Sequence, residues 1–300
     1  MRVARVAAQA KINLFLHVGP RQPSGYHEIF TLFQLLELAD DVVVRVGGDK
    51  RSVDVAGPHL PEGGLGPPEK NLAFRAAVEY VNRTGRPRGF SIELTKNVPA
   101  GGGLGGGSSD AGAVLRALDA LSEHPLDAEA LSDLAASVGS DVPFFVSNLP
   151  NALGHGRGER LAGVEPLPSR AVALACPSFG ISTADAYRWL DDDGGSTWTP
   201  MELPADHTVS GVLGIGDWKG IRLKAHNDFE PPVERRHPAL KRIRERLGES
   251  GAMVARLSGS GSTVFGIFEG SVPTAADLAL DALVIPTRTS ARVVQVEVLE

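Results

Sequence analysis

The sequence predicts a mixed fold of helices and strands, of the α+β class, in two lobes. Its 300 residues correspond to about two domains at roughly 150 residues each. Stretches with strand periodicity and stretches with helical periodicity alternate in both halves of the chain. Since the second series of elements starts near residue 160, we expect an N-terminal lobe over 1–160 and a C-terminal lobe over 161–300.

The N-terminal lobe is expected to begin with strands. The apolar runs at 12–18, 29–37 and 41–46 are typical of buried strands. Residues 47–68 are rich in glycine and proline, which favour turns. We therefore expect a loop or an irregular hairpin between the third strand and the next element.

A helix and a half-buried strand follow. Residues 70–84 carry apolar side chains at helical spacing, and Gly85 supplies a C-terminal stop. Phe90, Ile92 and Leu94 alternate with polar residues, which indicates a strand with one buried face.

Two more helices are predicted before the end of this lobe. Residues 108–121 carry an apolar face at helical spacing. Asp127 is placed to cap a further helix over 128–138, which Gly139 ends.

The C-terminal lobe repeats the alternation. Residues 171–176 predict a buried strand, and 183–190 a short helix. The composition of 191–220 is typical of a variable surface insertion. The remaining predicted elements are a basic surface helix over 238–247, strands at 254–257 and 264–268, a helix near 273–283 and a strand at 292–299.

Composition limits the classes of partner and compartment. The formal net charge of −6 argues against duplex nucleic acid or an anionic membrane as the main partner, because both bind basic surfaces. The single cysteine, Cys176, permits no intrachain disulfide and no cysteine-rich zinc site. Arg5 interrupts the apolar stretch before Ala10, and no run reaches the roughly 20 apolar residues of a membrane span. We therefore expect a cytoplasmic protein.

The strongest local pattern is a glycine-rich run that ends in two serines. It reads Pro99-Ala-Gly-Gly-Gly-Leu-Gly-Gly-Gly-Ser-Ser109, directly before the predicted helix over 108–121. So many glycines suit a backbone that approaches a ligand closely. The free N–H groups at the positive end of the helix then form an anion site, most often for phosphate. Ser108 and Ser109 add hydroxyls for helix capping, phosphate or Mg²⁺.

Other interpretations of this loop fit less well. No lysine follows Gly107, so the Walker A pattern is absent. Gly101, Gly103 and Gly106 formally match the dinucleotide fingerprint, but a turn separates them from the preceding strand and the following helix leads to another helix. A flexible linker would not be expected to abut a well-patterned helix.

The loop resembles the phosphate loop of the GHMP kinases, the family of galactokinase, homoserine kinase and mevalonate kinase. Its Gly-Gly-Gly-Ser-Ser-Asp-Ala form is similar to one branch of that family, in the non-mevalonate isoprenoid pathway. With the loop, four further segments make five that agree in order, from residue 10 to about 268, and five in order are specific. The four are Ala10-Lys-Ile-Asn-Leu-Phe-Leu16, Gly25-Tyr-His-Glu28, Gly139-Ser-Asp-Val-Pro-Phe-Phe145 and Ser258-Gly-Ser-Gly261. The family usually has proline where Gln9 stands, which should alter only the local turn.

The resemblance implies a fold and a reaction. The N-terminal, ATP-binding lobe would resemble the second domain of ribosomal protein S5, and the C-terminal, substrate-binding lobe would be ferredoxin-like. The reaction would be transfer of the γ-phosphate of ATP, with Mg²⁺, to the 2-hydroxyl of a small molecule, a cytidine diphosphate-linked methylerythritol. The protein would be a monomer or a homodimer, and which groups hold the metal stays unknown.

The resemblance also implies two catalytic residues. Asp141 would be the general base that accepts the hydroxyl proton. Pro143 favours extended geometry at Val142, so we expect the chain to leave the helix sharply after Gly139. Lys11 would lie beside Asp141, orient the acceptor oxygen and stabilise its developing charge. A lysine in an apolar strand needs such a partner. Phosphoryl transfer depends mainly on positioning and electrostatics, so this pair is chemically sufficient with Mg²⁺ and the glycine-rich loop.

Two sets of binding residues complete the implied site. Near ATP the resemblance places Asn71, Lys96, Pro99, Ala100, Gly101, Gly102, Gly103, Leu104, Gly105, Gly106, Gly107, Ser108 and Ser109. Near the acceptor it places Asn13, Tyr26, His27, Tyr187, Gly259, Ser260 and Gly261. In this interpretation His27 reads the cytosine edge, and the two tyrosines stack on the base.

Two alternatives remain open from the residues. Another GHMP kinase, of the homoserine or mevalonate type, would need no nucleobase platform, so Gly25-Tyr-His-Glu28 with Lys11-Ile-Asn13 argues against it. A catalytically silent nucleotide-binding protein would not need intact Lys11 and Asp141.

Overall fold

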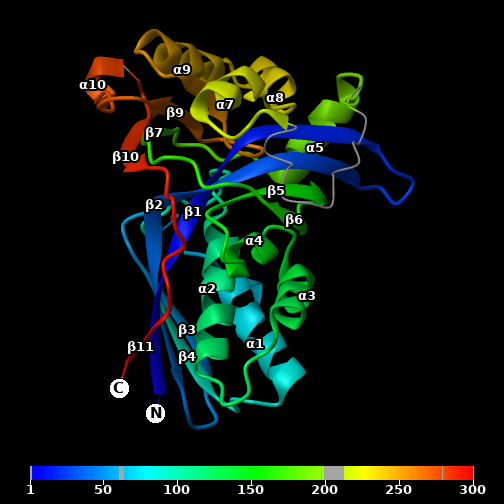
Figure 1. Ribbon diagram of the computed structural model, residues 1–300, viewed down its shortest axis with the longest axis vertical. Coiled ribbons are helices and arrows are strands. Elements are labelled where there is room, and N and C mark those ends of the chain that lie inside the picture. The colour runs from blue at the N-terminus through cyan, green and yellow to red at the C-terminus, as the bar shows by residue number, and fades with distance from the viewer. Residues whose placement is uncertain (1, 61–63, 197, 199–212, 279, 300) are drawn as a thin grey trace.

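Two long antiparallel strands run through much of the molecule. The computed structural model describes residues 2–60, 64–196, 198, 213–278 and 280–299 (Figure 1). β1 (Arg2–Arg21) and β2 (His27–Val46) pair from Arg2↔Val46 to Arg21↔His27. The predicted strands at 12–18, 29–37 and 41–46 are therefore parts of two continuous strands, because Asp40 inside β2 finds buried partners and causes no turn.

The two halves of β2 pair with different strands of the first sheet. The second part of β2 pairs with β4 (Phe90–Thr95), and β4 pairs in parallel with β3 (Arg51–Ala56). β3 lies within the segment 47–68, for which the sequence left a loop or an irregular hairpin open, and it forms the edge of the sheet. A 3₁₀ turn, η1 (Pro68–Lys70), follows.

The first part of β2 supports a hairpin that the sequence analysis did not assign. It pairs with β5 (Asn151–Gly156), which pairs with β6 (Arg160–Gly163). β11 (Glu297–Leu299) pairs with β1, so the two ends of the chain lie side by side (Figure 1). The first sheet thus takes strands from both predicted lobes, and the division at residue 160 stays a prediction.

Three helices cover one face of this sheet. α1 (Leu72–Thr84), α2 (Gly106–Ala120) and α3 (Ala128–Val138) pack in one buried core with β1, β2 and β4. The short α4 (Val142–Val146) follows α3. Val142 begins this helix, so the extended geometry expected before Pro143 is wrong: proline at the start of a helix displaces no intrahelical hydrogen bond.

The second sheet has the order β10-β7-β9-β8 and is antiparallel throughout. Its strands are β7 (Ala171–Cys176), β8 (Val254–Leu257), β9 (Val264–Phe268) and β10 (Leu283–Arg288). The sequence analysis missed β10, which contains Pro286 and tolerates it as an edge strand.

Helices surround the second sheet at the upper end of Figure 1. They are α5 (Thr183–Asp192), α7 (Trp218–Lys224), α8 (Glu230–Arg236), α9 (Pro238–Glu249) and α10 (Ala275–Leu278). The helix predicted near 273–283 is only four residues long, and the strand predicted at 292–299 is limited to Glu297–Leu299. Residues 197 and 199–212 of the predicted insertion lie outside the described residues.

The α+β prediction is confirmed by these two sheets and their helices. No helix among the described residues is long and apolar enough to cross a membrane.

Candidate active site

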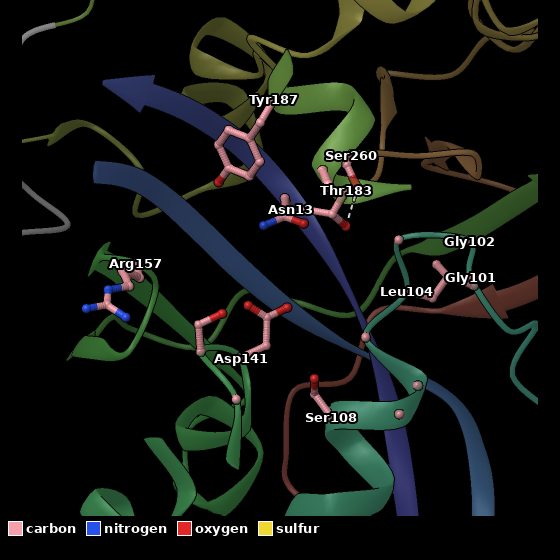
Figure 2. Close-up of a pocket in the computed structure, with 18 of the residues that line it drawn as sticks. Asn13, Gly101, Gly102, Leu104, Ser108, Asp141, Arg157, Thr183, Tyr187 and Ser260 are labelled. Atoms are coloured by element: carbon pink, nitrogen blue, oxygen red, sulfur yellow. Dashed lines mark hydrogen bonds between the residues drawn. The ribbon is translucent and has the colours of Figure 1, made fainter. Parts of the chain in front are cut away.

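A cavity of about 1320 Å³ opens between β1, the start of α2, α5 and the loop between β8 and β9. Of the residues predicted to bind or react, all but two line it; the two exceptions are Ser109 and Gly261. Figure 2 shows side chains entering it from several elements, with Asp141 and Ser108 on one side and Asn13 and Tyr187 on another.

The glycine-rich loop forms one wall and leads directly into α2. The helix begins at Gly106, two residues before its predicted start. Gly105 is the residue before the helix and has a φ of 70°, a left-handed conformation that favours glycine. No side chain caps this end, so the first N–H groups of α2 are available to an anion.

A second loop supports the glycine-rich loop from behind. Ser258 Oγ donates to the carbonyl of Gly103 at 2.9 Å, and the N–H of Thr263 donates to the carbonyl of Gly102 at 3.1 Å. A Cβ at Gly103 would lie 2.1 Å from the carbonyl oxygen of Ser258. Only glycine permits this approach, so the loop holds its shape by contact with the second sheet.

Lys11 lies on β1 between two β-bulges, which redirect side chains along the strand. Its side chain is only 5% exposed, and its Nζ donates to Asn13 Oδ1 at 2.7 Å. The Nζ lies 3.6 Å from Asp141 Oδ2. Burial lowers the pKa of Lys11 and the charge of Asp141 opposes that shift. The pair therefore combines a poorly solvated ammonium with a carboxylate at the cavity.

Asp141 reaches the cavity from the residue just before α4. The break between α3 and α4 directs its side chain away from the helix core, and 28% of that side chain remains exposed. A carboxylate in this place can accept a proton from a bound hydroxyl group.

The two serines at the start of α2 face different ways. Ser108 lines the cavity and points toward it (Figure 2). Ser109 is buried, and its Oγ donates to the carbonyl of Gln9 at 2.7 Å. Ser109 therefore ties α2 to β1, and its predicted contact with ATP stays a prediction.

Lys96 is buried between two carboxylates. Its Nζ contacts Asp40 and lies 2.5 Å from Asp110 Oδ2. Burial alone would lower its pKa, but the two carboxylates outweigh burial and raise it. Asp40 also accepts from the N–H groups of Asn97 and Val98 at 2.5 and 2.7 Å. This cluster fixes the chain that leads into the glycine-rich loop; contact of Lys96 with ATP stays a prediction.

Asn71 caps α1 at another edge of the cavity. Its Oδ1 accepts from the N–H of Ala73 at 2.9 Å and that of Phe74 at 3.3 Å. Its side-chain amide N–H₂ is the group left for a ligand.

His27 and Tyr187 lie together in the lining of the cavity. Their rings stack at 4.9 Å between centroids. His27 Nδ1 donates to the carbonyl of Gly19 at 2.9 Å, since a carbonyl only accepts, and Nε2 lies 3.4 Å from Asp191 Oδ1. Burial raises the pKa of Tyr187 to about 12, so its hydroxyl stays neutral near pH 7.

Tyr26 offers a further aromatic face. It is 54% exposed, and the guanidinium of Arg157 lies 4.3 Å from its ring centroid. An exposed ring backed by a cation is suited to stacking on a flat ligand.

The second glycine-containing loop brings the C-terminal half of the chain to the cavity. Asn227 Nδ2 donates to the carbonyl of Gly259 at 2.8 Å, and Ser260 Oγ lies 3.1 Å from Thr183 Oγ1. Gly259 and Ser260 line the cavity, while Gly261 is packed behind against Leu257.

Sequence reasoning missed several residues of the cavity. Arg157 follows Gly156 in the unassigned β5–β6 hairpin, and Asp191 and Thr183 lie at the two ends of α5. The adjacent Gly-Arg-Gly-Glu at 156–159 was an available turn signal for Arg157. No local sequence pattern pointed to Asp191 as a site residue, because the residue it contacts, His27, is distant in the sequence.

Comparison with known proteins adds family relationships to this geometry. Two family models match: the N-terminal domain of GHMP kinases over 71–148, and the GHMP kinases C-terminal over 212–283. A relative from Anaeromyxobacter dehalogenans (strain 2CP-C), named 4-diphosphocytidyl-2-C-methyl-D-erythritol kinase, is 45% identical over 266 residues, 88% of this chain and 80% of its own. A relative of the same name from Moorella thermoacetica is 40% identical over 267 residues, 89% of this chain and 90% of its own.

A solved structure supports the same family relationship, and a second shares the fold. A crystal structure of 4-(cytidine 5′-diphospho)-2C-methyl-D-erythritol kinase superposes with a TM-score of 0.72 at 34% identity, and covers 95% of this chain and 98% of that one. Homoserine kinase from Cytophaga hutchinsonii superposes with a TM-score of 0.68 at 18% identity, over 99% of this chain and 97% of that one. The second likeness shows a shared fold alone.

Proposed function

The chain belongs to the GHMP kinase family, and on that premise we propose that it transfers the γ-phosphate of ATP to the 2-hydroxyl of 4-diphosphocytidyl-2-C-methyl-D-erythritol. The observation that carries this proposal is the buried Lys11 Nζ, 3.6 Å from Asp141 in the cavity that also receives the uncapped end of α2. The γ-phosphate and the acceptor hydroxyl can be brought together between the start of α2 and the Lys11–Asp141 pair.

The reaction follows from the side chains. The phosphates of ATP lie against the glycine-rich loop, where the N–H groups of α2 balance their charge. Asp141 accepts the proton of the acceptor hydroxyl as its oxygen attacks the γ-phosphorus. The bond to the bridging oxygen breaks and ADP leaves. Lys11 holds the attacking oxygen in line and stabilises its developing charge.

The donor set at the cavity suits Mg²⁺. This ion prefers oxygen ligands and is commonly held by one or two carboxylates and substrate phosphates. The hydroxyl of Ser108 faces the cavity at the start of α2 and would hold it together with phosphate oxygens of ATP (Figure 2). Bound there, the ion would neutralise charge on the transferring phosphate.

The aromatic lining supports a cytidine-containing acceptor. A base inserted beside Tyr26 and Tyr187 would stack on them and present its edge to His27. Base–aromatic stacking contributes roughly 1–3 kcal/mol per base. Asn13, Gly259 and Ser260 also line the cavity, and a Cβ at Gly259 would lie 3.4 Å from Lys11 Nζ and 3.5 Å from Asn13 Oδ1, so the methylerythritol would bind beside them. A cytoplasmic location and a monomeric or homodimeric state stay predictions.

The test is ³¹P NMR of the protein with Mg-ATP and each of three acceptors: the cytidylyl compound, homoserine and mevalonate. We expect a new phosphomonoester signal and ADP only with the cytidylyl compound. Turnover of homoserine or mevalonate instead would contradict the proposed acceptor. ATP binding without turnover of any of them would favour a silent nucleotide-binding protein.

A variant separates base recognition from catalysis. His27→Ala should chiefly raise the KM for the cytidylyl substrate, because it removes the base-reading group and leaves Lys11 and Asp141 in place. A change only in the KM for ATP would show that His27 does not contact the base.

A further inference from the structure

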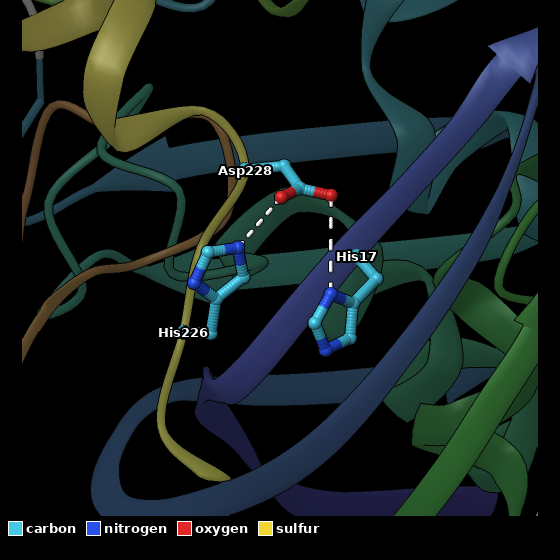
Figure 3. A group of neighbouring side chains, drawn as sticks. All are labelled: His17, His226 and Asp228. Carbon is cyan, nitrogen blue, oxygen red and sulfur yellow. Dashed lines mark hydrogen bonds and ion pairs between the residues drawn. The ribbon is translucent and has the colours of Figure 1, made fainter. Parts of the chain in front are cut away.

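Three metal-ligating side chains gather outside the cavity. His17 comes from β1, and His226 and Asp228 come from the segment between α7 and α8 (Figure 3). None of them lines the active-site cavity. One donor atom from each lies within 4.8 Å of the others.

The backbone builds this cluster. The N–H of Leu16 donates to the carbonyl of His226 at 2.8 Å, and the N–H of Asp228 donates to the carbonyl of Leu16 at 3.0 Å. This segment therefore runs alongside β1 in extended form. His226 and Asp228 are two residues apart and project from one face, while Asn227 projects from the other.

The three side chains are near enough to one another to share one ion. Asp228 Oδ1 lies 2.6 Å from His226 Nε2, and Asp228 Oδ2 lies 3.9 Å from His17 Nδ1. Ligand atoms about 2.0–2.1 Å from a tetrahedral zinc ion are about 3.3 Å apart. The two contacts use different oxygens of Asp228, so a shared ion would draw one donor atom from each residue closer together. The side chain of His226 is 47% exposed, so it is free to rotate by the small amount required and solvent reaches the site.

The surroundings favour ligation. Asp228 Oδ2 accepts from the N–H of Val18 at 2.7 Å, an outer contact that orients the carboxylate. The ring of His17 packs against that of Trp198 at 5.8 Å between centroids, which holds its plane, while the stacked ring of His226, at 4.9 Å, would turn to point a nitrogen at a shared ion.

We propose that His17, His226 and Asp228 bind one divalent transition-metal ion of zinc-like preference, with solvent in the remaining position. Zinc-like ions bind a set of two imidazoles and one carboxylate readily, whereas carboxylate, carbonyl and water oxygens suit Mg²⁺ and Ca²⁺.

The ion would link two parts of the chain that meet at the active site. Between the two ligands of the extended segment, Asn227 donates to the carbonyls of Leu257 and Gly259, each at 2.8 Å. Gly259 lines the cavity. Metal binding therefore fastens this segment to β1 and, through Asn227, supports the loop proposed to hold the acceptor.

The test is equilibrium dialysis of tag-free, full-length protein against micromolar Zn²⁺ at pH 7.5 without nucleotide, followed by metal analysis. We expect one Zn²⁺ per chain in the wild type. His226→Gln, a change at an exposed side chain, should weaken binding at least about tenfold, as should His17→Gln. His124→Gln, at an exposed histidine remote from the cluster in sequence, is the matched control and should bind as the wild type does.

Thermal unfolding supplies a second readout. Zn²⁺ should raise the Tm of the wild type and of His124→Gln, but not that of His226→Gln, because only a ligand bound to the folded state stabilises it. Absence of stoichiometric Zn²⁺, or equal affinity in the wild type and both cluster variants, would overturn the proposal. A Tm that rises equally in His226→Gln would also overturn it.

Discussion

Two buried lysines flank the start of α2, and their surroundings differ in the charges that face them. A Cβ at Gly105 would lie 3.0 Å from the Lys11 side chain, and one at Gly106 would lie 3.5 Å from Lys96 Nζ. Lys96 contacts two buried carboxylates, whereas Lys11 has one, partly exposed, at 3.6 Å. The pKa of Lys96 is raised and that of Lys11 is lowered.

This difference shows that burial alone does not indicate whether a lysine serves stability or catalysis. With Asp40 and Asp110, Lys96 joins β2, the end of β4 and α2, so its charge is used within the fold. Lys11 keeps an incompletely compensated charge at the edge of the cavity, available to a substrate oxygen. We therefore expect changes at Lys96 to act mainly on stability and changes at Lys11 mainly on catalysis.

The largest expected effect is on the partner of Lys11. Asp141→Asn should lower kcat by roughly 10²–10⁴-fold with little change in ATP affinity, because it removes the proposed base and keeps the side-chain shape. Steady-state kinetics and nucleotide titration measure this. Asp191→Asn, at another carboxylate of the same cavity that contacts His27, is the control and should change kcat much less. Activity of Asp141→Asn within threefold of wild type would remove Asp141 from the base role.

The next effect is on stability. Lys96→Met should lower the free energy of unfolding by about 3–5 kcal/mol, because it leaves Asp40 and Asp110 buried without their cation. Urea unfolding followed by circular dichroism measures it. Adding Asp110→Asn to that variant should recover part of the loss, since one buried charge is removed. A Lys96→Met protein as stable as wild type, with a raised KM for ATP, would show a binding role instead.

Lys11→Met should affect catalysis strongly and stability little, the reverse of Lys96→Met. We expect kcat to fall roughly 10²–10³-fold, the usual loss when one donor to a developing charge is removed. At pH 7 the free energy of unfolding should change by less than about 1 kcal/mol, because Asp141 keeps contact with solvent. The same urea series measures both lysine variants side by side. A loss of stability as large as that of Lys96→Met would contradict the contrast.

The smallest effect is the pH dependence of these differences. The pKa of Lys11 is lowered on folding, so the unfolded chain binds more protons and the contribution of Lys11 to stability rises with pH, up to about 10.4. The pKa of Lys96 is raised, so its contribution is fully present below about 10.4 and is lost only above that pH.

Urea unfolding at pH 8, 9 and 10 checks these signs. The stability of wild type relative to Lys11→Met should grow by at most about 1.4 kcal/mol per pH unit, while that relative to Lys96→Met stays constant. If both differences in the free energy of unfolding changed equally with pH, the two lysines would experience equivalent environments.

Much of the fold could be predicted from local patterns. The helical spacing that predicted 70–84 and 128–138 corresponds to α1 and α3, and alternation of apolar residues predicted β4. The hairpin of β5 and β6 was not predicted, because pairing with β2 rather than local periodicity makes these segments strands. For the segment that contains β3, the sequence left a loop or an irregular hairpin open.

The amino-acid sequence by itself determined the mixed fold, the glycine-rich approach to α2 and the set of polar residues around it, because these depend on periodicity and on the conformational freedom of glycine. Only the tertiary structure decided which lysine is neutralised, that Ser109 turns inward, and that His17 meets His226 and Asp228. Charge balance and hydrogen bonding act through space, and these partners are separated by up to about two hundred residues of chain, so no local pattern encodes them.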